Sequence, residues 1–523
     1  MRTSEPLHSI AERHPNVGRR RQGLAAAVLL ASAALVLSAC TATSPDPGAP
    51  ASTTLKVGIA SLSDGDATDP AKASTAGGYV LARQVFDTLT EYGTDGSWQP
   101  QLAESVKAGK DAADWTVTLH KATWSDGTPV TAADVVATVK RWFDDKLPPA
   151  GSMPFIDPGK VTVVDDQTVH FQLKYPTVTF PEALTSPTAS IVPQGFDPGK
   201  PIGSGPFVLT SNHPGVQLTF TANEKYFRGA PGVDKLDVVS FADATSEANA
   251  LTAGQIDVAS DLDPTLVDVV KASTTDKVYN YPTSGTLTWV MNTQKKPFTD
   301  PAVMKALRLA VDRQAIVDQV YNGYAKLGND YFSPFDPLYD HDLPQRAYDP
   351  AQAKSILTQA GYALPVPVEL WGTDNTPTSK RQNEALVTQA AAAGFAVTFK
   401  NVDSATFYGD AYGTYPLSLS YWGFLGIFDQ AGFTITKTAP YNSSHWIDPE
   451  YDKLYNEALQ TVDESARRGL VAQMQTIEYE RGAYVVPVFL DRIIGVSTKV
   501  KGMQSYPNSD GPFGYNFRIL SLG

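Results

Sequence analysis

Side chains suited to nucleophilic or metal chemistry are scarce in this sequence. Cys40 is its only cysteine, and none of the seven histidines is spaced from another as metal ligands are. We find no zinc-protease, nucleophile-elbow, P-loop or dinucleotide motif, and the glycines after Pro201 lack the lysine and the spacing of a phosphate loop. The motifs therefore predict no enzyme, cofactor or metal. A hard-metal site at Tyr339–Asp342 and a chance pair among the 55 acidic residues remain alternatives.

Cys40 stands where an apolar run gives way to a proline-rich one. The run, Leu24–Leu37, is shorter than the roughly 20 residues of a membrane-spanning helix. Arginines precede it, as is typical of a secretory signal peptide. The sequence from Leu37 to Cys40 resembles the lipobox of bacterial lipoproteins, in which the cysteine is lipidated and becomes the new N-terminus. We therefore expect residues 1–39 to be removed and Cys40 to anchor the chain to the outer face of the cell membrane. A cleaved signal peptide with a chance cysteine is the alternative.

The segment 40–54, rich in small residues and proline, is expected to be a semi-extended tether. Beyond it, 42% hydrophobic and 10% aromatic content indicates a large folded body. The net charge is −13, and the first 39 residues carry five arginines against Glu5 and Glu12, so the remainder is near −16. Phosphate backbones would repel such a chain, so nucleic acid is not an expected partner.

Strand-like and helix-like segments alternate along this body. Strand patterns occupy 54–60, 114–120, 160–173, 216–223 and 285–293. Helix starts are marked by Asp300, Asp312, Asp349 and Asp448, and by Thr131 with Asp134 as a capping box. The helix after Thr131 is expected to turn Val135, Val136, Val139 and Phe143 inward. These elements predict an α/β fold with mixed sheets.

Eight strings occur in the order typical of one family. They begin at Asp69 ("DPAKASTAGGYVLARQVFDTLTEYGTDGSWQPQLAES"), Trp115 ("WTVTLHKATWSDGTPVTAADVVATVKR"), Val164, Pro201, Asn223, Leu251, Met291 and Tyr348. With them the chain resembles the extracellular solute-binding proteins of ABC importers in the peptide/nickel class, family 5. The resemblance covers nearly everything after about residue 55.

The resemblance implies a periplasmic-binding-protein-like fold of the type II, cluster C-like kind, with two lobes, hinge strands and an inserted third domain. Lobe I would comprise 54–86, 198–286 and 488–523, the insert 87–197, and lobe II 287–487. It further implies a monomer that captures a peptide-like or other small solute between the lobes and delivers it to an ABC permease and ATPase. A surface-anchored hydrolase and a structural lipoprotein are the alternative functions.

The resemblance also places the segment Leu419–Phe433 along the bound solute. Trp422 is expected to stack on a flat or apolar part of it, and a core tryptophan is the alternative. The other expected ligand contacts, in this loop and on the facing walls, are Gly423, Phe424, Leu425, Asp429, Gly78, Tyr79, Trp289, Asn292, Met153 and Phe155.

One position departs from the peptide-binding members. They carry an aspartate three residues after the loop tryptophan, which pairs with the ligand's α-ammonium group; here that position is Leu425. A buried ammonium without a counter-charge is costly, so unblocked peptides are expected to bind poorly. Asp429 is the nearest carboxylate and would replace the aspartate only if the loop is remodelled around Gly426.

Overall fold

The structure, a computed structural model, describes residues 53–60, 62–63, 67–373, 376–509 and 511–523. The predicted signal peptide, Cys40 and nearly all of the predicted tether lie outside these residues. Among the helices that it describes, none combines the length and the apolar character needed to cross a membrane.

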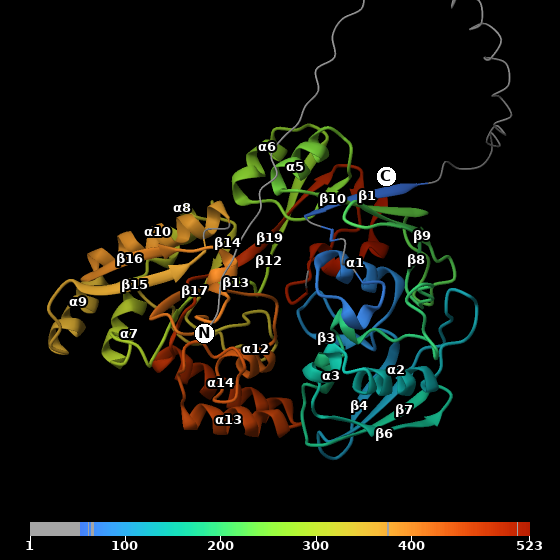
Figure 1. Cartoon of the computed structure of the whole chain (residues 1–523), viewed down its shortest axis with the longest axis horizontal. Coiled ribbons are helices and arrows are strands. Elements are labelled where there is room, and N and C mark those ends of the chain that lie inside the picture. The colour runs from blue at the N-terminus through green and yellow to red at the C-terminus, as the bar shows by residue number, and fades with distance from the viewer. Residues whose placement is uncertain (1–52, 61, 64–66, 374–375, 510) are drawn as a thin grey trace, which may run out of the picture. The chain divides into compact units, whose positions relative to one another are not determined.

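The largest sheet has eight strands drawn from distant parts of the sequence (Figure 1). Its order is β12 (Asp276–Pro282), β19 (Val488–Ser497), β11 (Val258–Ala259), β1 (Thr54–Ala60), β10 (Lys235–Phe241), β9 (Gln217–Ala222) and β8 (Phe207–His213), with β14 (Ala325–Leu327) paired to β19. β1 runs parallel to β10 and β11, whereas β19 is antiparallel to β11 and β12. We call this sheet, with helices α1 (Ala76–Val85), α5 (Ala244–Thr252) and α6 (Val267–Lys271), the large-sheet lobe.

A second core surrounds a five-stranded sheet. Its order is β16 (Phe395–Asn401), β15 (Val366–Gly372), β17 (Leu417–Trp422), β13 (Thr286–Met291) and β18 (Tyr484–Val485). The helices of this part are α7 (Pro301–Leu309), α8 (Arg313–Gln319), α9 (Pro350–Gln359), α10 (Pro377–Ala392), α11 (Ser404–Phe407), α12 (Ile427–Thr434), α13 (Pro449–Gln460) and α14 (Glu464–Arg481). We call it the small-sheet lobe.

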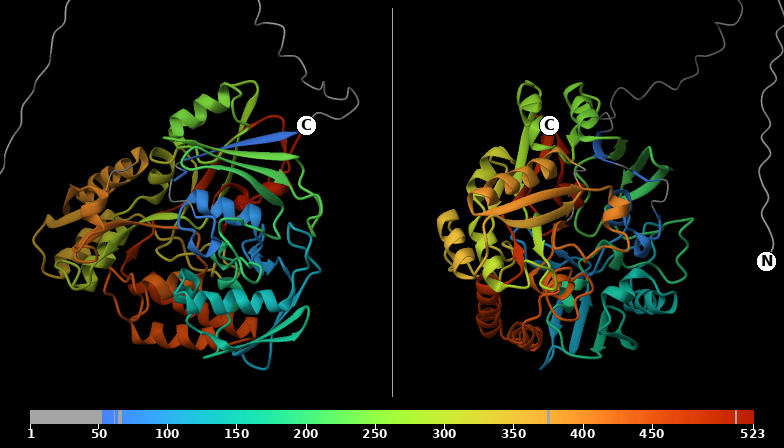
Figure 2. Two further views of the ribbon diagram at one scale, coloured as in Figure 1. Left: turned by 45° about the vertical axis from the view of Figure 1, so that its right-hand side comes forward. Right: turned by 60° about the vertical axis from the view of Figure 1, so that its left-hand side comes forward.

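The third core belongs to a four-stranded antiparallel sheet, here called the inserted sheet. It contains β4 (Ala103–Ala108), β5 (Asp114–Leu119), β7 (Thr168–Leu173) and β6 (Ile156–Asp165), with helices α2 (Ala132–Asp144), α3 (Pro148–Ser152) and α4 (Phe180–Ala183). The short pairs β2 (Thr90–Tyr92) with β3 (Trp98–Pro100) and β20 (Val500–Lys501) with β21 (Ser521–Leu522) are separate. In Figures 1 and 2 the α13–α14 pair lies beside the inserted sheet, and the Val178 amide donates to the Leu459 carbonyl over 2.8 Å.

Local signals placed several elements correctly. β1 coincides with the predicted strand, and Asp300, Asp349 and Asp448 each cap a helix whose first residue is proline. The predicted inward face of α2 is partly wrong. Val135 and Val139 are buried, but Thr138 and Trp142 complete that face, and Val136 and Phe143 are only half-buried.

The chain crosses between the two lobes at two places that lie close to each other. It leaves β12 through residues 283–285 to enter β13, and it returns from β18 through residues 486–487 to enter β19. The Val486 amide donates to Asp330 Oδ1 over 3.2 Å, and the Gly328 amide donates to the Pro487 carbonyl over 2.9 Å. The returning crossing is therefore attached to the segment around Asp330.

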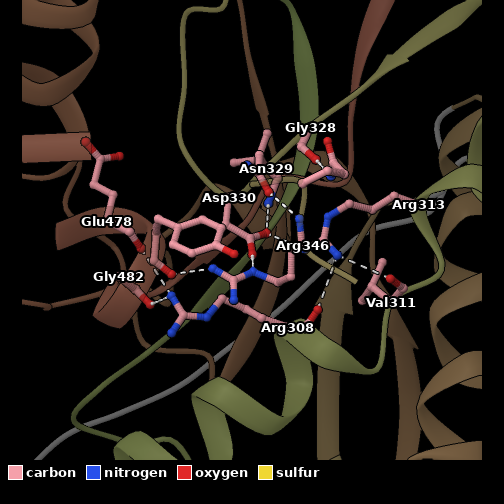
Figure 3. A network of polar contacts seen from close by, with 12 residues as sticks. Arg308, Val311, Arg313, Gly328, Asn329, Asp330, Arg346, Glu478 and Gly482 are labelled. Atoms are coloured by element: carbon pink, nitrogen blue, oxygen red, sulfur yellow. Dashed lines mark hydrogen bonds and ion pairs between the residues drawn. The ribbon is translucent and has the colours of Figure 1, made fainter. Parts of the chain in front are cut away.

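Asp330 is the centre of a buried ionic network (Figure 3). Its fully buried carboxylate accepts from Arg313 Nη2 over 2.6 Å and pairs with Arg346 Nε. Arg308 donates from Nη1 to the Gly482 carbonyl over 2.8 Å. Burial alone would raise the pKa of Asp330, but the guanidinium groups of Arg313, Arg346 and Arg308 outweigh it and hold the pKa below its usual value. The network joins the end of α14 to the returning crossing.

Candidate functional site

A cavity of about 670 Å³ lies between the two lobes beside both crossings. The large-sheet lobe lines it with residues that include Asp243, Asp261, Asp263, Asp491 and Arg492; the small-sheet lobe with Tyr321, Tyr324, Thr378, Tyr408, Tyr421 and Phe424; and the first crossing with Thr283 and Gly285. We call it the main cavity. Its walls combine carboxylates, hydroxyl groups and aromatic rings.

The two lobes touch each other around the main cavity. Thr378 Oγ1 of the small-sheet lobe donates to Asp263 Oδ2 of the large-sheet lobe over 3.0 Å. Because this bond could not persist if the lobes separated, the structure represents an arrangement closed around the cavity.

Two carboxylates of the main cavity have different partners. Asp261 pairs with Arg492 over 3.4 Å, whereas Asp491 Oδ2 accepts from Asn280 Nδ2 over 2.8 Å. Asp491 Oδ1 is buried and has no hydrogen-bond partner among the described residues. Burial raises the pKa of Asp491. Asp491 Oδ1 can therefore accept a hydrogen bond from a donor in the main cavity.

A smaller cavity, of about 200 Å³, lies where the two lobes meet the inserted sheet. Glu182 of α4 lines it from the inserted sheet, Arg83, Tyr92 and Tyr515 line it beside the large-sheet lobe, and Phe424, Leu425, Asp429 and Phe433 line it from the small-sheet lobe. Among the described residues, Phe424 alone lines both cavities. We call this space the acidic cavity.

Three carboxylates converge at the acidic cavity. Glu182 Oε1 accepts from the Tyr92 hydroxyl over 2.7 Å, and Asp336, just behind the lining, accepts from the Ile427 amide over 2.9 Å. Burial, and then the charge of Asp336, raises the pKa of Asp429 to about 6. Burial and the charges of Asp429 and Asp336 raise the pKa of Glu182 well above its usual value. A cation entering here would relieve repulsion between like charges.

The carboxylates at the acidic cavity do not form a metal centre. Among the described residues, no group of three or more histidine, cysteine, aspartate or glutamate side chains is arranged to hold a metal ion. The arrangement instead suits an organic cation that makes hydrogen bonds, such as an ammonium group.

Of the predicted contact residues, the structure brings Phe424, Leu425 and Asp429 together at these cavities. Neighbouring Trp422 and Gly423 do not line either cavity. Trp422 packs against the small-sheet core, with its ring centroid 6.3 Å from that of Tyr441. Side chains alternate along β17, so the side chain that points into the main cavity is Tyr421.

The other predicted contacts lie inside the lobes rather than on the cavities. Trp289 is fully buried and donates from Nε1 to Asn383 Oδ1 over 3.0 Å, and Asn292 Nδ2 donates to the Gly413 carbonyl over 3.0 Å. The remaining ones are Gly78 and Tyr79 in α1, and Met153 and Phe155 in the core of the inserted sheet. We therefore leave them out of the candidate site.

Several residues of the site carried no sequence signal. Glu182, Arg492 and Asp263 come from separate segments, and none forms a motif with Asp429. Tyr421 lies in the predicted ligand segment. Because side chains alternate along a strand, the sequence could have placed Tyr421 on the same face as Leu419.

Two lobes that are joined by two crossings and closed over a shared cavity define a protein that captures a solute by domain closure. The family described as "Bacterial extracellular solute-binding proteins, family 5 Middle" matches residues 97–444. The chain belongs to this family of extracellular solute-binding proteins.

The chain is also similar to individual proteins. Di/tripeptide-binding protein 1 of Pseudomonas aeruginosa is 29% identical over 505 residues, covering 87% of this chain and 92% of the relative. Heme-binding protein A of Haemophilus influenzae is 27% identical over 488 residues, covering 83% of this chain and 86% of the relative. The crystal structure of the ABC transporter substrate-binding protein CtaP from Listeria monocytogenes matches with a TM-score of 0.79 at 23% identity, covering 90% of this chain and 99% of that one.

The predicted family, the two-lobed α/β fold and the role in solute capture are confirmed. The chain is a substrate-binding protein of an ABC importer and acts outside the cytoplasm. Its family consists of solute-binding proteins rather than enzymes.

Proposed function

We propose that the main cavity is where this protein encloses its solute. The observation that carries the proposal is that both lobes line one cavity beside the crossings about which they would move. Its volume of about 670 Å³ lies within the roughly 300–1,000 Å³ of small-molecule sites. The moving bodies would be lobe I (54–86, 198–286 and 488–523), carrying the insert 87–197, and lobe II (287–487).

The acidic cavity supports a solute with a cationic end. At about 200 Å³ it is too small for a whole solute but can take a terminal group. Asp429 lines the same cavity as Leu425, which supports Asp429 as the counter-charge that Leu425 cannot supply. A relative that binds di- and tripeptides agrees with this chemistry. The solute is therefore a small, unblocked peptide or a similar amine, with its ammonium group near Asp429.

Addition of solute is expected to compact the protein and to raise its melting temperature with solute concentration, since a ligand that binds only the folded state stabilises it. Small-angle scattering and thermal unfolding with a mixture of unblocked dipeptides provide the measurements. Recovery of the dipeptides unchanged is expected from a carrier that is not an enzyme. A dipeptide-dependent shift accompanied by hydrolysis would instead support the hydrolase alternative.

Lipid anchoring at Cys40 is a separate proposal, supported by the position of the only cysteine after the apolar run. Metabolic labelling with a fatty-acid analogue is expected to tag the wild-type protein and not Cys40→Ser, because acylation requires the thiol. Ser38→Ala, which keeps the cysteine, serves as the control and should still be labelled. Labelling of Cys40→Ser would contradict the proposal.

A further inference from the structure

Phe424 occupies an unusual place in the site. It follows β17 in the small-sheet lobe, and its side chain lines both the main cavity and the acidic cavity. Tyr421 lines only the main cavity, whereas Leu425 and Asp429 line only the acidic cavity. Phe424 therefore lies where the walls of the two spaces meet.

Contacts with the opposite lobe hold this ring in place. The Arg492 guanidinium of β19 lies 5.0 Å from the centroid of the Phe424 ring, close enough for a cation–π interaction. Arg492 is itself held by Asp261. On the first crossing, a Cβ added to Gly285 would lie 3.1 Å from Phe424 Cε1, so the ring rests almost against the backbone there.

These contacts restrict where the ring can move. A shift toward Gly285 meets the backbone, and a shift away from Arg492 loses the cation–π interaction. The space that a solute can use beside Phe424 is thus fixed by the ring itself. Leu425, in the same loop, and Asp429, in the first turn of α12, line the acidic cavity.

We propose that Phe424 is a specificity-determining residue that limits the size of the solute group next to the cationic end. The inference rests on the proposed function, in which the ammonium group lies in the acidic cavity and the body of the solute in the main cavity. A solute that spans both must pass the ring of Phe424. A small first residue, such as glycine, fits beside it, and a large aromatic one collides with it.

The test compares wild type, Phe424→Ala and Phe424→Leu by calorimetric titration with glycyl-leucine and phenylalanyl-leucine. Wild type is expected to bind glycyl-leucine roughly tenfold or more tightly than phenylalanyl-leucine. Phe424→Ala should remove most of that preference by gaining affinity for phenylalanyl-leucine, and Phe424→Leu should remove part of it.

The possible outcomes separate this inference from the proposed function. If wild type binds the dipeptides but the ratio of dissociation constants is unchanged in both Phe424 variants, the role of Phe424 is wrong and the proposed solute class stands. If no protein binds either dipeptide, the proposed solute class fails and the inference fails with it. A melting curve for each variant establishes that it is folded, and Phe424→Leu carries the test if Phe424→Ala is not.

Discussion

Asp330→Ala is expected to lower the free energy of unfolding by about 3–5 kcal/mol, the cost of breaking a buried ion pair by removing one partner. Arg313 and Arg346 are themselves almost fully buried, with 3% and 8% of their side chains exposed. Asp330 is the carboxylate with which both guanidinium groups pair among the described residues, so its removal leaves two buried charges without that partner. The Val486 amide at the returning crossing would also lose its acceptor. Denaturant unfolding monitored by tryptophan fluorescence measures the change.

Asp144→Ala is the matched control for this prediction. Asp144 also pairs with a basic residue, Lys140, but both side chains are more than half exposed. Exposed pairs contribute little, so the control should change stability by less than about 1 kcal/mol. Similar small effects for both variants would show that the network of Asp330 does not stabilise the fold.

Asp429→Asn is expected to weaken binding of unblocked dipeptides by roughly 30-fold or more, corresponding to the about 2–5 kcal/mol lost when a buried charge pair is broken. Asparagine keeps the size of the side chain and removes its charge. Binding by wild type should also weaken as the pH falls, because burial and the charge of Asp336 raise the pKa of Asp429 to about 6. Above that pH the carboxylate is ionised and pairs with the ammonium; below it the carboxylate is protonated and the attraction is lost.

N-acetylated dipeptides provide the control, because they lack the ammonium group. Wild type and Asp429→Asn should bind them equally weakly, with no change in affinity near pH 6. If acetylation leaves the affinity of wild type intact, or if Asp429→Asn binds unblocked dipeptides as tightly as wild type, Asp429 does not receive a cationic end. The expectation drawn from Leu425 would then apply after all.

The features predicted most accurately are those that depend on neighbours in the sequence. The aspartate–proline starts of α7, α9 and α13 need only one turn of helix to act, and the structure has all three. The inward face of α2 differs from the predicted face because Trp142 fills the inserted core and Thr138 Oγ1 donates to the Val192 carbonyl over 3.0 Å. Both interactions depend on distant segments.

The candidate site was predicted less well for the same physical reason. Phe424, Leu425 and Asp429 could be predicted because all three lie in the segment Leu419–Phe433, which resembles the ligand-binding segment of the family. Glu182 meets that loop only after the inserted sheet has packed against the small-sheet lobe, and no spacing in the sequence records such a contact. Trp289 and Asn292 were expected on the cleft because they follow the hinge, but their hydrogen bonds to Asn383 and Gly413 turn them inward.

The place of β19 has a consequence for how the protein is made. β19 lies inside the largest sheet, between β12 and β11, although it is one of the last strands in the sequence. Until residues 488–497 leave the ribosome, β12 has no neighbour that connects it to the rest of that sheet, and the wall containing Asp491 and Arg492 does not exist. Chains that end before β19 therefore cannot enclose a solute, although they contain more than nine-tenths of the sequence.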